Sequence, residues 1–278
     1  APEMAYQRQR DGDGQPLFAS PGITALAVLD WNQDGLRDLA ATAWSVDALV
    51  LMPGDRQEVF GIPKLISAPG APRDLQAADM NQDGRTDLIV AYYATSEFSV
   101  WYGNGQGNFT EASRIPTRGK LPTAVRVADF NGDGQQDIAV SHCHATDNIV
   151  IFLGAPRQPY SISADIELGK DRKILEKEIR DLTVADFNGD GKPDLAATAF
   201  ASGEIALLLN QTASGGMPAF DVQWIPVDRG KPRSLCAADL DNDGDPDLAI
   251  TVWSPDGVLL ARNDLAQKSP AAQKNSSR

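Results

Sequence analysis

The sequence predicts an all-β protein, a β-propeller of five blades whose ring is closed by an N-terminal strand that joins the C-terminal blade. The first observation is a nine-residue pattern, Asp-x-Asn/Asp-x-Asp-Gly-x-x-Asp, that occurs five times. The copies begin at Asp30, Asp79, Asp129, Asp186 and Asp239, at intervals of 49, 50, 57 and 53 residues. The second observation is that interval, which is typical of one propeller blade. The third is the apolar run after every copy, without a convincing helix.

Each repeat predicts four short strands, the content of one blade. Representative segments are 25–29 before the loop, 194–200 directly after it, 148–153 for the third strand and 109–115 for the fourth. We expect one domain over residues 1–265, with blades that begin near residues 23, 72, 122, 179 and 232. Residues 1–20 are expected to supply the outer strand that the fifth blade lacks, and residues 266–278 to form a polar, flexible tail.

The chemistry of the repeated loop predicts a hard cation. Side-chain oxygens at positions 1, 3, 5 and 9, with the backbone carbonyl of position 7, can surround one ion at about 2.3–2.6 Å, the Ca²⁺ distance. Glycine at position 6 permits the sharp turn. No copy has the Glu at position 12 that completes a helical EF-hand. Magnesium prefers strict octahedral geometry, and zinc prefers Cys and His ligands, which the loops lack.

The sequence therefore predicts about five Ca²⁺ sites. Their expected ligands, in loop order, are Asp30, Asn32, Asp34, Leu36 and Asp38; Asp79, Asn81, Asp83, Arg85 and Asp87; Asp129, Asn131, Asp133, Gln135 and Asp137; Asp186, Asn188, Asp190, Lys192 and Asp194; and Asp239, Asp241, Asp243, Asp245 and Asp247. The net charge of −13 is largely the charge of these loops, and five Ca²⁺ ions would neutralise most of it. Such acidity argues against nucleic acid or an anionic membrane as partner.

The loops and their surroundings resemble the FG-GAP repeats, also called VCBS-type repeats, of integrin α-subunit propellers and many secreted bacterial proteins. The segments that carry the resemblance are Phe60-Gly61, then Gly70-Ala71-Pro72, then the loop that begins at Asp79. The resemblance covers nearly the whole chain and implies Ca²⁺ caged between the first and second strands of the blades. It does not imply one activity. Integrin-type rings have seven blades, so the expected count of five departs from those relatives.

The expected compartment is extracellular, cell-surface or periplasmic, because numerous weak Ca²⁺ sites suit surroundings in which Ca²⁺ is plentiful. No run of about 18 apolar residues predicts a membrane span. Ala1-Pro2-Glu3 is expected to be the start of a mature chain after signal cleavage.

Two further sets of residues are expected on the face opposite the loops. Six residues after the ninth-position Asp stand four aromatics and one cysteine: Trp44, Tyr93, Cys143, Phe200 and Trp253. Six residues before the first Asp stand three arginines: Arg73, Arg180 and Arg233. The aromatics either stack on sugar rings or protein side chains, or fill the gaps between blades. The arginines either hold a carboxylate or phosphate, pair with an acid such as Asp74 or Asp181, or are solvated.

The third blade departs from this pattern with Ser141-His142-Cys143-His144, which contains both histidines of the chain. Neighbours in a strand point to opposite faces, so a structural or surface role is favoured over a transition-metal site. No nucleophile–base set or convincing pair of catalytic acids is visible.

We therefore expect a non-catalytic recognition module that binds a glycan or a protein on the face opposite the Ca²⁺ loops. Two alternatives stay open: an accessory subunit of a larger extracytoplasmic assembly, and a propeller that acts as a polysaccharide hydrolase or lyase.

Overall fold

The computed structural model describes residues 22–57, 59–143, 148–155, 160–168 and 178–264. Within these ranges the fold is all-β, and the only helix is the single 3₁₀ turn η1 (Trp44–Val46). No described helix has the length and apolar character that a membrane crossing requires. The closing strand expected in residues 1–20 and the tail expected in residues 266–278 lie outside the described part of the chain.

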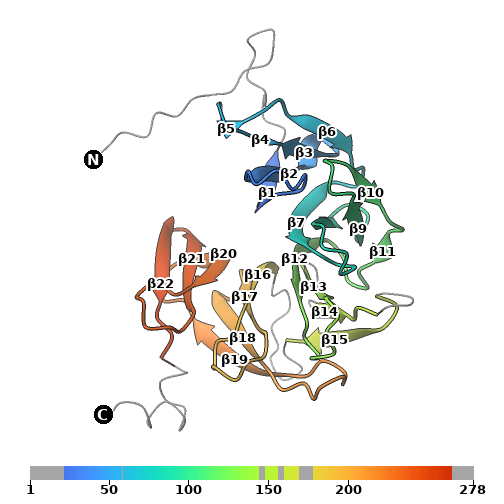
Figure 1. Cartoon of the computed structure of the whole chain (residues 1–278). Coiled ribbons are helices and arrows are strands. Elements are labelled where there is room, and N and C mark those ends of the chain that lie inside the picture. Colours follow the sequence, from blue (N-terminus) through green and yellow to red (C-terminus); the bar gives the residue numbers. More distant parts are fainter. Residues whose placement is uncertain (1–21, 58, 144–147, 156–159, 169–177, 265–278) are drawn as a thin grey trace, which may run out of the picture.

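Five antiparallel sheets follow one another around a central axis as five blades, which confirms the predicted fold class (Figure 1). Their strands are, in blade 1, β1 (Ile23–Leu29), β2 (Asp38–Ala43), β3 (Ala48–Met52) and β6 (Lys64–Ser67); in blade 2, β7 (Pro72–Ala78), β8 (Asp87–Tyr92), β9 (Glu97–Gly103), β10 (Phe109–Glu111) and β11 (Ile115–Pro116); in blade 3, β12 (Pro122–Ala128), β13 (Asp137–His142), β14 (Asn148–Phe152) and β15 (Ser163–Glu167); in blade 4, β16 (Ile179–Ala185), β17 (Asp194–Ala199), β18 (Glu204–Asn210) and β19 (Phe220–Pro226); and in blade 5, β20 (Lys231–Ala238), β21 (Asp247–Trp253) and β22 (Gly257–Ala261). A small hairpin, β4 (Gly54–Asp55) and β5 (Val59–Phe60), extends from blade 1.

The apolar core lies between the blades. Alternate residues of each strand face opposite neighbours, so one blade contributes to two separate clusters. In blade 2, Leu88 and Val90 pack towards blade 1, whereas Ile89 and Ala91 pack towards blade 3. Two further clusters join blade 3 to blade 4 and blade 4 to blade 5. These four clusters explain why the strands after the loops are almost continuously apolar: they are buried on both faces.

Blades 1 and 5 stand at the two ends of the series, and their outward faces are exposed in the described structure (Figure 1). Leu26 and Val28 of blade 1 are 60% and 63% exposed, although the counterpart of Leu26 in blade 2, Leu75, is buried. On blade 5, Val258 and Leu260 are 64% and 70% exposed. The described residues therefore bury four of the five interfaces that a closed ring of five blades would have.

A β-bulge recurs near the start of every inner strand. The pairing between β7 and β8 shifts between Pro72 and Asp74, which leaves Arg73 without a partner on β8. The same shift occurs around the corresponding residues of the other four inner strands, and it leaves Thr24, Thr123, Arg180 and Arg233 likewise unpaired in the ladder. A bulge changes the direction of a side chain and increases local twist. The side chain of each bulge residue is therefore not bound to the alternation of the sheet faces, and all five bulge residues lie at the same end of the inner strands.

Candidate functional site

The five loops connect the first and second strands of each blade, and their backbone is held by their own side chains. In the first loop, Asp30 accepts hydrogen bonds from Asp34 N–H at 3.1 Å and Gly35 N–H at 3.0 Å. The N–H of Asp34 is also donated to Asn32, and that of Leu36 to Asp34. The same bonds recur in the other four loops. The sequence therefore folds each loop into one shape with its oxygen side chains gathered.

The ninth-position aspartate of every loop is buried and joins the loop to the third strand. Asp137 accepts from Phe130 N–H at 2.9 Å with Oδ2 and from Gly154 N–H at 2.7 Å with Oδ1. Asp38, Asp87, Asp194 and Asp247 make the equivalent pair of bonds. These carboxylates have a structural task beyond the ligand role expected from the sequence, and the pattern of the loop alone did not indicate it.

Burial raises the pKa of the Asp137 carboxyl to about 6, because desolvation outweighs the two backbone hydrogen bonds and because Asp133 and Asp129 add negative charge. Burial likewise raises the pKa values of Asp38, Asp87 and Asp194. A cation beside these groups would favour their charged form. The loops are thus sites where negative charge is concentrated at an electrostatic cost.

The donor chemistry of the loops fits Ca²⁺. In the fifth loop, carboxylate oxygens of Asp239, Asp241 and Asp247 lie within 4.8 Å of one another, close enough to share one ion at Ca²⁺–oxygen distances. These three side chains offer oxygen, the ligand type of a hard cation. Arg262 also contacts Asp241 in this loop, and Arg85 contacts Asp83 in the second. Occupancy by Ca²⁺ stays a prediction.

At the opposite end of the inner strands, the bulge residues surround a cavity of about 390 Å³. We call this region the arginine mouth and define it by the bulge residues Thr24, Arg73, Thr123, Arg180 and Arg233. Arg73 precedes Asp79 by six positions, so the mouth and the loops lie about 20 Å apart along a strand. The structure thus brings the three predicted arginines together on the face opposite the loops.

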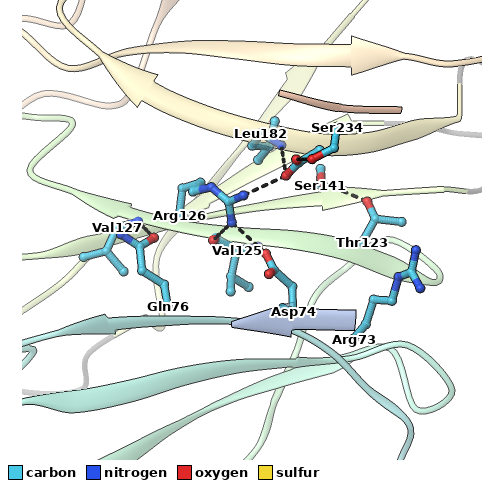
Figure 2. Close-up of polar contacts among 12 residues, drawn as sticks. Arg73, Asp74, Gln76, Thr123, Val125, Arg126, Val127, Ser141, Leu182 and Ser234 are labelled. Atoms are coloured by element: carbon cyan, nitrogen blue, oxygen red, sulfur yellow. Dashed lines mark hydrogen bonds and ion pairs between the residues drawn. The ribbon is translucent and has the colours of Figure 1, made fainter. Parts of the chain in front are cut away.

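Arg126 lines the cavity and joins three blades through its polar contacts (Figure 2). Its guanidinium lies 2.7 Å from Asp74 of blade 2 and 2.7 Å from Asp181 of blade 4. Asp74 also accepts the Val125 N–H at 2.8 Å, and Asp181 accepts bonds from the N–H of Leu235 and the hydroxyl of Ser234. Of the alternatives left open for the mouth arginines, pairing with a local acid is seen for Arg180, which contacts Glu178. Asp74 and Asp181 instead pair with Arg126, from the intervening blade.

The mouth arginines stack on the predicted aromatics instead. Arg73 lies over Trp44, with 5.6 Å from the guanidinium carbon to the ring centroid. Arg180 lies over Phe200 at 4.9 Å, and Arg233 lies over Trp253 at 5.3 Å. Such contacts hold a planar guanidinium in one orientation and leave its edge available.

The aromatics also contact one another across blades, so they do fill inter-blade gaps. The Trp44 and Tyr93 centroids are 4.9 Å apart, and those of Phe200 and Trp253 are 6.0 Å apart. Trp253 is nevertheless 50% exposed. The two interpretations given by the sequence are therefore compatible, because the same rings pack between blades and border the mouth.

The third blade places His142 at the end of β13, where it is buried. Its ring packs so closely on the backbone that a Cβ at Gly119 would lie 2.4 Å from its Cγ. Cys143 follows the strand, and His144 lies outside the described residues. The packing of His142 is that of a structural residue.

Sequence reasoning named Asp74 and Asp181 as pairing acids but missed Arg126, the residue to which they bind. The signal was present in the aligned repeats, because Asp stands five residues before the loop only in blades 2 and 4, and Arg stands three residues before it only in blade 3. An acid on each side of a single arginine suggests an ion pair between neighbouring blades once the blades are known to be adjacent.

The comparisons agree with the fold. The family model described as FG-GAP-like repeat matches residues 30–90, 79–140 and 186–250, more than half of the chain. Over 189 residues the chain is 28% identical to the T-cell immunomodulatory protein of Rattus norvegicus, an alignment that covers 63% of this chain. It covers 28% of that relative, so the chain spans less than a third of the relative's length.

Two solved structures resemble the propeller at low sequence identity, which shows the fold alone. Virginiamycin B lyase from Staphylococcus aureus has a TM-score of 0.57 at 12% identity, covering 91% of this chain and 73% of that one. An Agrocybe aegerita lectin that recognises non-reducing terminal N-acetylglucosamine has a TM-score of 0.53 at 18% identity, covering 87% and 64%. With its repeated loops, its blades and the match of the family model, the chain belongs to the FG-GAP-like repeat family.

Proposed function

We propose that the chain is a non-catalytic recognition module of the extracytoplasmic space, stabilised by about five Ca²⁺ ions, which binds a glycan or protein partner at the arginine mouth. The observation that carries the proposal is the set of three arginine–aromatic stacks at the mouth. Arginine and aromatic side chains are the residues that dominate binding energy in interfaces. Their position opposite the loops leaves that face open to a partner.

The Ca²⁺ part of the proposal rests on chemistry and charge. Oxygen-only donors gather in five equivalent loops, and the buried ninth-position aspartates lie beside further carboxylates. Ca²⁺ in the loops would offset this repulsion and fix the connection between the first and second strands. Sites of this kind fill where Ca²⁺ is abundant, which supports a location outside the cytoplasm.

Recognition is favoured over catalysis because of how the acids at the mouth are used. A glycosidase needs two carboxylates free to act on one bond. Asp74 and Asp181, the acids that line the cavity, both bind Arg126. The relative named as an immunomodulatory protein supports an interaction role, and membership of a larger assembly would be one form of it.

A binding experiment on the Ca²⁺-loaded protein tests this function. Glycan arrays and pull-downs from the source's extracytoplasmic fraction are compared for the wild type and for Trp44→Ala and Trp253→Ala. We expect a specific sugar or protein to be captured by the wild type and lost in both variants. Phe60→Ala, on the β5 strand of the hairpin beside blade 1, is the matched control and should bind normally.

Two results would contradict the proposal. One is a partner whose binding survives both tryptophan substitutions but is lost with Phe60→Ala. The other is turnover of a polysaccharide by the wild-type protein, which would establish catalysis.

A further inference from the structure

Three guanidinium groups from three different blades share the arginine mouth. Arg73 comes from blade 2, Arg180 from blade 4 and Arg233 from blade 5, and all three line the same cavity. Burial lowers the pKa of Arg73, and the positive charges of Arg180 and Arg233 lower it further, which reports their mutual proximity. Figure 2 shows Arg73 and Thr123 at the same end of neighbouring strands. Like charges brought together in this way repel and favour an anion between them.

The charges at the mouth are incompletely balanced. Arg126 bonds to both acids that line the cavity, and Arg180 pairs with Glu178 at 2.7 Å. Among the described residues, no ion pair is formed by Arg73 or Arg233. Both are held on aromatic rings, and Arg233 is exposed. The mouth therefore concentrates positive charge on two oriented guanidinium groups, although the net charge of the whole chain is −13.

The arrangement of the arginines discriminates between kinds of anion. A carboxylate offers two oxygens in one plane and suits one bidentate arginine. A tetrahedral oxyanion offers oxygens in several directions, which matches guanidinium groups that approach from three blades. Thr24 and Thr123 line the same cavity, but their hydroxyls donate to the backbone carbonyls of Arg73 and Ile179, so the guanidinium groups are the donors offered to an anion. The volume of the cavity, about 390 Å³, favours a compact group.

We propose that the arginine mouth binds a tetrahedral oxyanion, a sulfate or phosphate group, either free or as an ester at the end of a saccharide. The inference rests on the proposed function, because it names the chemical group by which the partner is recognised. The half-exposed Trp253 beside Arg233 provides an apolar face on which a sugar ring that carries the ester would pack. A volume of about 390 Å³ accommodates the anion together with one such ring.

Calorimetric titration of the Ca²⁺-loaded protein with sodium sulfate, at constant ionic strength, tests the site. We expect saturable binding of one sulfate, with affinity reduced at least about tenfold in Arg73→Gln and in Arg233→Gln, since each variant loses a charged hydrogen-bond donor. Arg73→Lys should retain part of the affinity, because charge remains but the planar fork is lost. Arg56→Gln, at an exposed turn of the β4–β5 hairpin, is the matched control and should bind sulfate as the wild type does.

A second titration identifies the source of the anion. Glucose 6-sulfate that binds more tightly than sulfate, with the excess lost in Trp253→Ala, assigns the site to a sulfated saccharide. Equal affinities assign it to the free oxyanion, and both results support the site. Unchanged melting temperatures establish that the variants are folded.

The inference is overturned if the wild type does not bind sulfate, if the Arg73→Gln/Arg233→Gln double variant binds it normally, or if acetate or a hexaglutamate peptide binds as tightly at equal ionic strength. Partner capture that still depends on Trp44 and Trp253 after such a result would leave the proposed function standing and remove only the oxyanion.

Discussion

At the scale of single residues, the ninth-position aspartate has a structural task, and the sequence predicts a second task as a metal ligand. Its two oxygens accept backbone N–H groups from the loop and from the end of the third strand, as Asp137 does with Phe130 and Gly154. Carboxylate oxygens have further lone pairs, so the same group can also face a cation. The structural task and the expected ligand task can be separated by experiment, because only the second requires a metal.

The substitution Asp137→Ala should lower the free energy of unfolding by about 2–4 kcal/mol even in excess chelator, because two buried N–H groups lose their acceptor. It should also reduce the number of bound Ca²⁺ ions by one. Urea denaturation and equilibrium dialysis measure the two effects. Asp133→Ala, at an exposed position of the same loop, is the matched control. It should reduce the number of bound Ca²⁺ ions by one but change the free energy of unfolding in excess chelator only slightly. An unchanged stoichiometry in both variants would refute the ligand assignment.

Arg126 is the other residue on which several blades depend. Substitution by Met keeps the bulk of the side chain but leaves Asp74 and Asp181 without their counter-charge, and removing one partner of a buried ion pair costs about 3–5 kcal/mol. We expect Arg126→Met to lower the free energy of unfolding in urea by about that amount. Adding Asp74→Asn and Asp181→Asn should restore part of the loss. Equal stability of Arg126→Met and the wild type would show that the ion pairs contribute nothing.

At the scale of the strand, the bulge leaves the mouth residue of each inner strand unpaired in the ladder. A backbone N–H beside the bulge then needs another hydrogen-bond acceptor. In blade 4 the Asp181 N–H is donated to the Thr198 hydroxyl at 3.0 Å, and in blade 5 the Ser234 N–H is donated to Thr251 at 3.1 Å. The threonine four residues after the ninth-position aspartate therefore satisfies the bulge.

These two threonines form a matched pair that differs in burial. Thr198 is fully buried, whereas Thr251 is exposed. Thr198→Val should lower the free energy of unfolding by about 1–3 kcal/mol, because an N–H without a partner is costly away from water. Thr251→Val should change it by less than about 0.5 kcal/mol, since water can replace the hydroxyl. Guanidinium denaturation of both variants measures the difference, and equal losses would contradict this account of the bulge.

At the scale of the whole molecule, the acidic loops lie at one end of the inner strands, and the three mouth arginines lie at the other. Negative charge held at one end repels itself without cations, whereas the mouth gathers positive charge without enough acids. The stability of the molecule is therefore expected to depend on Ca²⁺.

Chelation should lower the melting temperature markedly, because a site with free Ca²⁺ at 100 times its dissociation constant stabilises the folded state by about 2.7 kcal/mol. Differential scanning calorimetry with and without EDTA measures the shift. Readdition of Ca²⁺ should restore the melting temperature, and Mg²⁺ at the same concentration should restore less of it, because Mg²⁺ prefers fewer and stricter ligands. Equal melting with and without chelator would refute structural Ca²⁺.

Much of the fold was predictable because its signals are local. Five loops at a blade-sized interval and the apolar runs after them predict five blades, and the aromatics and arginines could be assigned to one end by counting residues from the loop. The partners of Asp74 and Asp181 were not predictable in this way. Their bonds to Arg126 join residues about fifty positions apart, and no local pattern reports which side chains of adjacent blades meet.

The sequence by itself therefore determined the all-β propeller, the position of the five oxygen-rich loops and the residues available on the opposite face. The reason is that the position of a residue along a strand sets which sheet face its side chain points to and how far it lies from the loop. Only the tertiary structure decided which of those residues act together. The bulges direct Arg73, Arg180 and Arg233 towards one cavity. Arg126 pairs with Asp74 and Asp181, and the aromatic rings pack against the three mouth arginines. The physical reason is that charge pairing depends on distance in space, which is set only when the blades pack.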